Sequence, residues 1–197
     1  MGQAKQRGQS YDMMKQRLLD RHDGPSKTVA ATAINLFDRF ILPRRFTGAC
    51  YQVTMTLQKY FSERHSIITE AVVGYVNDGT DDIMISHGWL EYEGMKIDLG
   101  LHLVERPDIV KPGALLVLDE PLRPGLLNYT YHLGRPAASL LVVQRMLADP
   151  ATAHVAHHKE TEHQEMLARS RDTQLRDLYL AGAPVDSNFT TMTSVLS

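Results

Sequence analysis

A helix followed by three closely spaced strands, between residues 47 and 103, most constrains the fold of this chain. The helix is expected to begin at Thr47, and its apolar side chains recur along one face, at Ala49, Val53, Leu57, Tyr60 and Phe61. Strand-forming residues dominate the next three segments, which we place at 66–76, 83–92 and 95–103. One long helix and then consecutive strands joined by turns predict an α+β domain with an antiparallel sheet.

The tight turn Glu93-Gly94 sets the register of the second and third strands. With these two residues as the turn, Trp89 pairs with Asp98 and His87 pairs with Gly100. Cross-strand partners share a face, as do residues two apart on one strand, so His87, Trp89 and Asp98 are expected on the same face. Asp98 is then the diagonal neighbour of His87, within reach of its side chain. A three-residue turn would instead place Asp98 on the opposite face.

Cys50 is the only cysteine in the chain and stands near the start of the predicted helix. With Thr47 as the N-cap it occupies the third helical position, where unpaired N–H groups and the helix dipole favour a thiolate. A thiolate nucleophile needs a base and a group that orients the base, and His87 and Asp98 would supply these. Each residue also has a plain structural interpretation, since lone intracellular cysteines are most often buried small hydrophobes and a His-Xaa-Trp strand can belong to a core.

These motifs together resemble the transglutaminase-like branch of the papain-like cysteine enzymes. The matching residues are Gly48-Ala49-Cys50, His87-Gly88-Trp89 and Asp98, in the family's order and rough spacing, within about residues 30–104. The likeness is closest to small bacterial members, which include proteases that cut leader peptides. It implies a papain-like core in which the cysteine helix packs on an antiparallel sheet. Trp89 is expected to pack beside the site and to shield the His–Asp pair from water.

The chain departs from the family pattern at two places near these residues. Gly88 stands where the family usually has alanine, and no glutamine lies shortly before Cys50 to donate a hydrogen bond to an oxyanion. The backbone N–H of Cys50, or the side chain of Tyr51 or Gln52, would then have to stabilise that charge.

The function expected from the resemblance is acyl transfer from an amide or peptide bond by a Cys50–His87–Asp98 triad. Hydrolysis by a cysteine peptidase or amidase is the first choice, with transglutaminase, deamidase or N-acyltransferase chemistry as the alternative. A protein or peptide substrate is expected, and neither a cofactor nor a metal is needed. A second hypothesis keeps the fold without catalysis and makes the chain an interaction protein that binds through its long C-terminal helix and basic arm.

Three segments are expected along the chain. Residues 1–25 would form a polar, basic arm and a helix from Tyr11 to about His22, and residues 26–136 the catalytic domain. That domain would open with a helix to about Phe40, broken by Pro43, and would close with a proline-rich excursion at 107–136 containing a strand at 114–118.

Residues 137–197 are predicted to form a C-terminal helical extension and a flexible tail. The first helix, at 137–147, would bury four apolar residues, namely Leu140, Leu141, Val143 and Met146. A highly charged helix at 151–181 would follow, and the Thr/Ser-rich tail from Ala183 would be flexible.

Histidines elsewhere in the chain offer alternatives. His154, His158 and Glu162 recur every four residues on the charged helix, a spacing that can hold a metal, but a solvated charged face is the preferred interpretation because no HExxH core accompanies them. The histidines His65, His102 and His132 are alternative bases, ranked below His87.

Charge and cysteine content limit the other functions. A formal net charge of −2 over 197 residues gives no general attraction to nucleic acid or to an anionic membrane, so neither is expected as a partner. No apolar run approaches the roughly 20 residues needed to span a bilayer. With one cysteine, an internal disulfide is impossible and a reducing cytoplasm is the expected location.

Overall fold

The computed structural model describes residues 2–196, with side chains from Ser10 onward. The helices before the sheet are α1 Gly2–Arg21, α2 Gly24–Leu36, the π-helical turn η1 Phe37–Ile41, α3 Leu42–Arg44 and α4 Cys50–His65. The strands are β1 Glu70–Asn77, β2 Ile85–Tyr92, β3 Met95–Asp98, β4 Leu115–Val117, β5 Glu120–Arg123 and β6 Thr130–His132. The C-terminal helices are α5 Ala137–Ala148, α6 Ala153–Arg171, α7 Thr173–Ala181 and α8 Phe189–Thr193.

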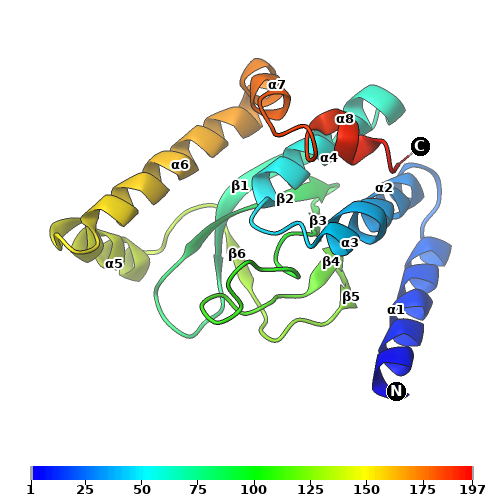
Figure 1. Cartoon of the computed structure of the whole chain (residues 1–197), viewed down its shortest axis with the longest axis horizontal. Coiled ribbons are helices and arrows are strands. Elements are labelled where there is room, and N and C mark those ends of the chain that lie inside the picture. The colour runs from blue at the N-terminus through cyan, green and yellow to red at the C-terminus, as the bar shows by residue number, and fades with distance from the viewer. Residues whose placement is uncertain (1, 197) are drawn as a thin grey trace.

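The six strands form one sheet in the order β5-β4-β3-β2-β1-β6, and every neighbouring pair is antiparallel. The sheet lies in the lower middle of the view, and the helices lie along its upper and right-hand sides (Figure 1). The predicted α+β class with an antiparallel sheet is therefore confirmed. The strand predicted at 114–118 corresponds to β4, whereas β5 and β6, in the proline-rich excursion, were not predicted.

α4 is the central helix, and it packs on β1 and β2. Four of the five residues in its predicted apolar stripe are buried, and the fifth, Ala49, packs partly buried against the same core. α2 and η1 add Phe37 and Phe40, which are fully buried, to the same core. The amphipathic pattern thus predicted the inward face of α4 correctly because that face is defined by residues three or four positions apart.

The start of α4 differs from the expectation. The N-cap is Ala49 rather than Thr47, so Cys50 is the first helical residue and not the third. Gly48 has a positive φ of 69° and turns the chain into the helix at this point. Cys50 nevertheless remains in the first turn, where the helix dipole acts most strongly.

The N-terminal helices are longer than expected. α1 begins at Gly2 rather than at the predicted Tyr11, and the second helix continues through η1 into α3. Pro43 lies within this continuous helical stretch, which ends instead at Arg45, where φ is positive at 50°.

The C-terminal region contains two helices in place of the single one predicted at 151–181. The break is at Asp172, whose carboxylate accepts hydrogen bonds from the backbone N–H groups of Gln174 and Leu175 and so caps α7. None of the described helices is both long enough and apolar enough to cross a bilayer.

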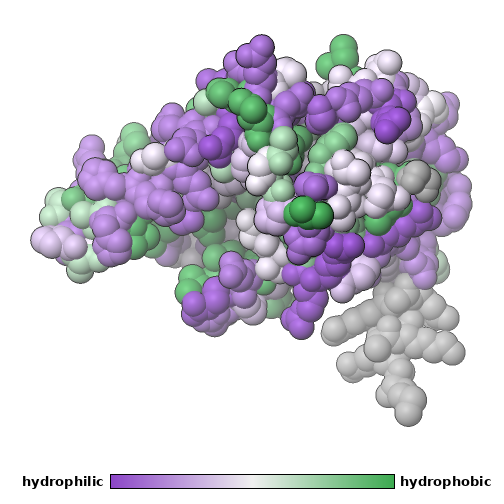
Figure 2. Space-filling view, turned by 45° about the horizontal axis from the view of Figure 1, so that its top comes forward, coloured by the Kyte–Doolittle hydropathy of each residue, from purple (hydrophilic) through white to green (hydrophobic). Residues whose placement is uncertain are grey.

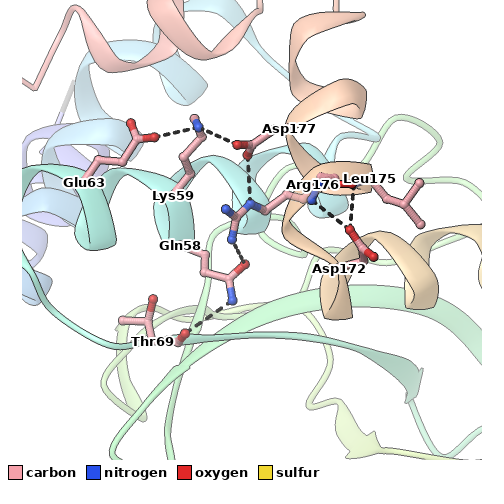
Figure 3. Close-up of polar contacts among 9 residues, drawn as sticks. Gln58, Lys59, Glu63, Thr69, Asp172, Leu175, Arg176 and Asp177 are labelled. Carbon is pink, nitrogen blue, oxygen red and sulfur yellow. Dashed lines mark hydrogen bonds and ion pairs between the residues drawn. The ribbon is translucent and has the colours of Figure 1, made fainter.

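α7 is tied to α4 by a small polar network (Figure 3). Arg176 donates to the Gln58 side chain at 3.0 Å and to Asp177 at 3.2 Å. Lys59 lies between Asp177, at 3.0 Å, and Glu63, at 2.7 Å. The helix that carries Cys50 is therefore held from outside by the C-terminal extension as well as by the sheet.

The apolar residues of α5 do not form a core, contrary to the prediction. Leu140 and Leu141 are 49% and 53% exposed, Val143 and Met146 are half-buried, and the fully buried side chain of α5 is that of Ser139. α5 packs on α6 at the end of the molecule away from the sheet, where apolar atoms reach the surface (Figure 2).

The segment after α7 also differs from the expected flexible tail. Residues 189–193 form α8, which packs on α4, and Met192 is completely buried in the main core. Asn188 caps α8 by accepting a hydrogen bond from the backbone N–H of Thr191. The tail is therefore part of the folded core.

Candidate active site

The hairpin of β2 and β3 brings His87 and Asp98 into contact. Its turn residues Glu93 and Gly94 both have positive φ, and the ladder pairs Tyr92 with Met95 as the predicted register requires. The regular pairing ends at Leu90 and Ile97, one position before the predicted Trp89–Asp98 pair. Even so, His87 Nε2 lies 2.8 Å from Asp98 Oδ2, so the two side chains share a face as the register predicted.

Asp98 is a buried carboxylate surrounded by hydrogen-bond donors. Tyr131 donates its hydroxyl to the same Oδ2 at 2.8 Å, and the backbone N–H groups of Gly100 and Leu101 donate to Oδ1 at 2.9 and 3.2 Å. Burial alone would raise the pKa of Asp98, but the charge of His87 and these hydrogen bonds lower it below its ordinary value. Asp98 is thus held as an anion behind the imidazole.

Cys50, partly exposed, meets the other side of the His87 ring. Since Nε2 faces Asp98, the remaining nitrogen, Nδ1, is the one available to the Cys50 side chain. Burial lowers the pKa of His87, but the charges of Asp98 and Cys50 outweigh it and raise the pKa to about 10. The ring therefore carries a proton at neutral pH, beside the only thiol of the chain.

Gly100 allows this close approach. A Cβ built on Gly100 would lie 3.0 Å from the Cβ of Cys50 and 3.2 Å from Cε1 of His87. A side chain at this position would therefore push the helix start and the histidine apart. The loop after β3 passes close to the two residues because it has no side chain there.

Gly88 allows a second close approach. A Cβ on Gly88 would lie 2.9 Å from the ring carbon Cδ1 of Tyr51. Glycine at this position therefore makes room for the Tyr51 ring, which packs at the start of α4 directly after Cys50.

Trp89 lies beside the His–Asp pair, as predicted. It is 2% exposed, and its ring stacks near His87 with centroids 6.5 Å apart and planes 19° apart. It also packs edge-on against Tyr131 at 5.1 Å, and its Nε1 donates to Glu91 at 2.8 Å. Its indole excludes water from that side of the imidazole.

The side chains of Tyr51 and Gln52 are bonded to other parts of the protein. The Tyr51 hydroxyl donates to Ser86 Oγ at 2.6 Å, and Gln52 Nε2 donates to the Ser187 carbonyl. The first backbone bond of α4 runs from Val53 N–H to the Ala49 carbonyl at 2.9 Å. The amides of residues 50–52 precede that bond and form the donor-rich end of the helix.

The alternative bases make other contacts. His102 hydrogen bonds to the Gly113 carbonyl and packs edge-on against Phe37, and burial lowers its pKa. His132 hydrogen bonds to Thr130, and the ring of His65 packs against Tyr60. In the part of the chain that the structure describes, no group of three His, Cys, Asp or Glu side chains is arranged to hold a metal ion, the set at His154, His158 and Glu162 included.

Sequence reasoning missed Tyr131 and Gly100. Tyr131 lies 33 positions after Asp98 in a three-residue strand, and no periodic pattern marks it. Gly100 was named only as a pairing position, although a glycine two residues after the orienting aspartate is a signal that the backbone comes close to something there.

Comparison with known proteins finds no match to this chain, whether among protein-family models, curated proteins or solved structures. The assignment of function therefore depends on the geometry of the site itself.

Proposed function

We propose that this protein is a thiol-dependent acyl-transfer enzyme that acts on an amide or peptide bond through Cys50, His87 and Asp98. The observation that carries the proposal is the chain of contacts from Cys50 at a helix start, through a protonated His87, to the buried Asp98 at 2.8 Å. A carboxylate with four donors and a glycine at the point of closest approach both support it. We further propose that α4 and the sheet form a papain-like, transglutaminase-like core.

The reaction follows from these positions. The Cys50 thiolate attacks the carbonyl carbon, and the carbonyl π electrons move onto oxygen. His87 then gives its proton to the leaving amine as the C–N bond breaks, which leaves a thioester on Cys50 and a neutral imidazole. A water molecule loses a proton to His87 and attacks the thioester, which releases the carboxylic acid and the thiolate. Asp98 holds the His87 ring in orientation throughout.

The oxyanion is assigned to the backbone N–H groups in the first turn of α4, chiefly that of Cys50. The side chains of Tyr51 and Gln52 are already bonded to Ser86 and Ser187, so the backbone amides ahead of the first helical bond are the better donors. Such donors cost no rearrangement during the reaction because the helix holds them in place.

Hydrolysis is the preferred outcome, since the likeness is to small protease-like enzymes, and transfer to an amine is the alternative. The substrate proposed is a protein or peptide. A free thiol nucleophile works only while it stays reduced, so a reducing compartment such as the cytoplasm is proposed as the location.

Alkylation across pH tests the proposal, and because Cys50 is the only cysteine, total labelling by iodoacetamide reports on it alone. The natural chain is expected to react readily at about pH 6–7, whereas His87→Ala should react only above about pH 8, like a free thiol. Asp98→Asn, which keeps the shape of the carboxylate, gives a second test in case His87→Ala does not fold. Its pH profile of alkylation should lie between those of the natural chain and His87→Ala. If the natural chain reacts only above about pH 8, and His87→Ala leaves that unchanged, the enzyme proposal fails.

Trapping identifies the reaction class. A peptide vinyl sulfone should add the mass of one reagent molecule to the natural chain, and a peptide chloromethyl ketone that mass less HCl, whereas neither should add to Cys50→Ala, as read by intact-mass measurement. Adducts formed only by simple alkylating agents, and by none of the peptide reagents, would contradict a peptide substrate.

A second candidate function is an interaction protein that keeps this fold. The observation that favours it is the exposed apolar surface of α5, with Leu140 and Leu141 about half exposed. This candidate predicts a His87-independent alkylation profile, so the same measurement separates the two.

A further inference from the structure

His163 on α6 differs from the other histidines of that helix. It is 3% exposed, whereas His154, His157 and His158 are exposed. Its ring stacks on Tyr75 of β1 with centroids 4.3 Å apart and planes 19° apart. A buried histidine in a solvated, charged helix calls for a partner, and the partner is a serine of the sheet.

Ser86 joins His163 to Tyr51. Ser86 Oγ lies 2.5 Å from His163 Nδ1, and the Tyr51 hydroxyl donates to the same Oγ at 2.6 Å. Because the Tyr51 hydroxyl donates to Oγ, the hydroxyl hydrogen of Ser86 remains available for Nδ1, and we infer that a neutral His163 accepts it and carries its own proton on Nε2. The three side chains form one hydrogen-bonded chain from α4 through β2 to α6.

The hydrogen bonds among Tyr51, Ser86 and His163 lie next to both segments that carry the site. Tyr51 directly follows Cys50, and Ser86 directly precedes His87. Neighbouring residues of a strand point to opposite faces, so Ser86 lies on the face opposite to His87. The hydrogen bonds therefore hold the backbone of both reacting residues from behind, one position away from each.

The surroundings keep His163 neutral and able to accept. Burial and the charge of Arg135 lower its pKa, against an opposing effect of Glu160. Arg135 pairs with Glu160 at 2.6 Å and lies over the Tyr75 ring at 4.2 Å. A protonated ring would have to donate at Nδ1, so Ser86 would no longer donate to His163.

We propose that His163 is a positioning residue for the Cys50–His87 pair, acting through Ser86 and Tyr51. This inference rests on the proposed function and deepens it, because it makes a side chain of the C-terminal extension part of the support of the site. The exposed histidines His154 and His158 have no such role.

Two substitutions at His163 separate positioning from simple packing. His163→Asn keeps an acceptor at the place of Nδ1, and His163→Leu keeps the volume without an acceptor. Met166→Ala is the matched control for packing, since Met166 is also buried on α6 and belongs to the apolar cluster that contains Tyr51, but takes no part in the Tyr51–Ser86–His163 hydrogen bonds. Each variant is alkylated across pH, and its thermal unfolding is recorded.

His163→Leu, Ser86→Ala and Tyr51→Phe should each slow alkylation at about pH 6.5 roughly tenfold, since a 1 Å misplacement of reacting groups is costly. His163→Asn should stay within about twofold of the natural chain. The double variant Tyr51→Phe/His163→Leu should be alkylated no more slowly than either single variant, because the hydrogen-bonded residues act as one unit. Met166→Ala should lower the unfolding temperature and leave the pH profile unchanged.

The inference is overturned if His163→Leu keeps the natural profile, or if Met166→Ala shifts it equally. Nitrogen-15 spectra of the natural chain measure the tautomer of His163 independently. We expect the proton on Nε2, and a proton on Nδ1 would overturn the inference. If the pH profile of alkylation depends on His87 and is unchanged in His163→Leu, this inference fails and the proposed function stands. If the profile of the natural chain does not depend on His87, the proposed function and this inference both fail.

Discussion

Gly100 shows how far the site depends on a single residue. It lies between Cys50 and His87, and its N–H also donates to Asp98 at 2.9 Å. The same position therefore contributes a hydrogen bond that any residue would keep and a space that only glycine leaves. Substitution there changes the space alone.

Gly100→Ala should separate the thiol from the imidazole with little effect on the fold. The added methyl would lie 3.0 Å from Cys50 Cβ, closer than ordinary contact, so the helix start or the ring must move. We expect alkylation of Cys50 at about pH 6.5 to slow at least tenfold. Gly134→Ala is the control, because a Cβ there meets nothing within 4 Å. Equal labelling rates in the two variants would show that this approach does not matter.

The His87–Asp98 pair should give stability a defined pH dependence. The pKa of His87 is raised from 6.5 to about 10, so its contribution is complete below pH 6.5 and is lost as pH rises through about 10. The pKa of Asp98 is lowered from 3.8, so its contribution is present above pH 3.8 and is lost as pH falls through its folded value. Stabilisation by the pair is therefore greatest between these limits.

His87→Gln tests this window by urea unfolding at a series of pH values. The natural chain should exceed the variant by about 3–5 kcal/mol between about pH 4 and 6.5, since removing one partner leaves a buried charge. The difference should shrink steadily towards pH 10. A difference that stays constant from pH 5 to pH 10 would contradict an ionised pair.

α7 shows what a single break does to a helical region. Residues 153–181 are divided at Asp172, where the backbone is extended (φ −115°, ψ 118°) between α6 and α7. The cap at Asp172 starts α7 in a new direction, so that Arg176 and Asp177 reach Gln58 and Lys59 of α4. The break thus connects the C-terminal extension to the helix that carries the thiol.

Asp172→Ala should lower the free energy of unfolding by about 0.5–2 kcal/mol, because two backbone N–H groups lose their acceptor. Asp172→Asn is the matched variant, since its side-chain oxygen caps nearly as well, and it should stay close to the natural chain. Chemical unfolding of the three proteins makes the comparison. Equal losses in both variants would point to the charge rather than to the cap.

At the scale of the whole molecule, the two ends of the chain complete one core. α1 contacts β5, α6 contacts β1 and α8 contacts α4. Leu18 near one end and Met192 near the other are both completely buried in the same apolar cluster. The regions before and after the segment that carries Cys50, His87 and Asp98 therefore contribute to its stability.

Met192→Ala should destabilise the protein by about 2–5 kcal/mol, the usual cost of truncating a fully buried side chain. Val185→Ala, in the same region but 81% exposed, should change stability by less than about 0.5 kcal/mol. Thermal and urea unfolding measure both. A similar, small effect of the two substitutions would mean that the C-terminal segment is not part of the core.

Short-range patterns predicted the elements next to the site well. The apolar stripe of α4 and the Glu93-Gly94 turn depend on residues at most a few positions apart, and the hairpin register brought His87 to Asp98. The prediction for α5 failed because it, too, used only a short-range pattern. A local pattern shows that Leu140 and Leu141 share a face, but not whether another element covers that face.

The placement of Cys50, His87 and Asp98 on a helix start and a hairpin follows from the amino-acid sequence alone, because helical periodicity and turn chemistry act between neighbours in the chain. The contact between Cys50 and His87 required the packed fold. The same is true of Tyr131 and Asp98, which are 33 positions apart, and of His163 and Ser86, which are 77 positions apart. Such contacts depend on how a whole sheet and its helices share one core, and no short segment encodes that arrangement.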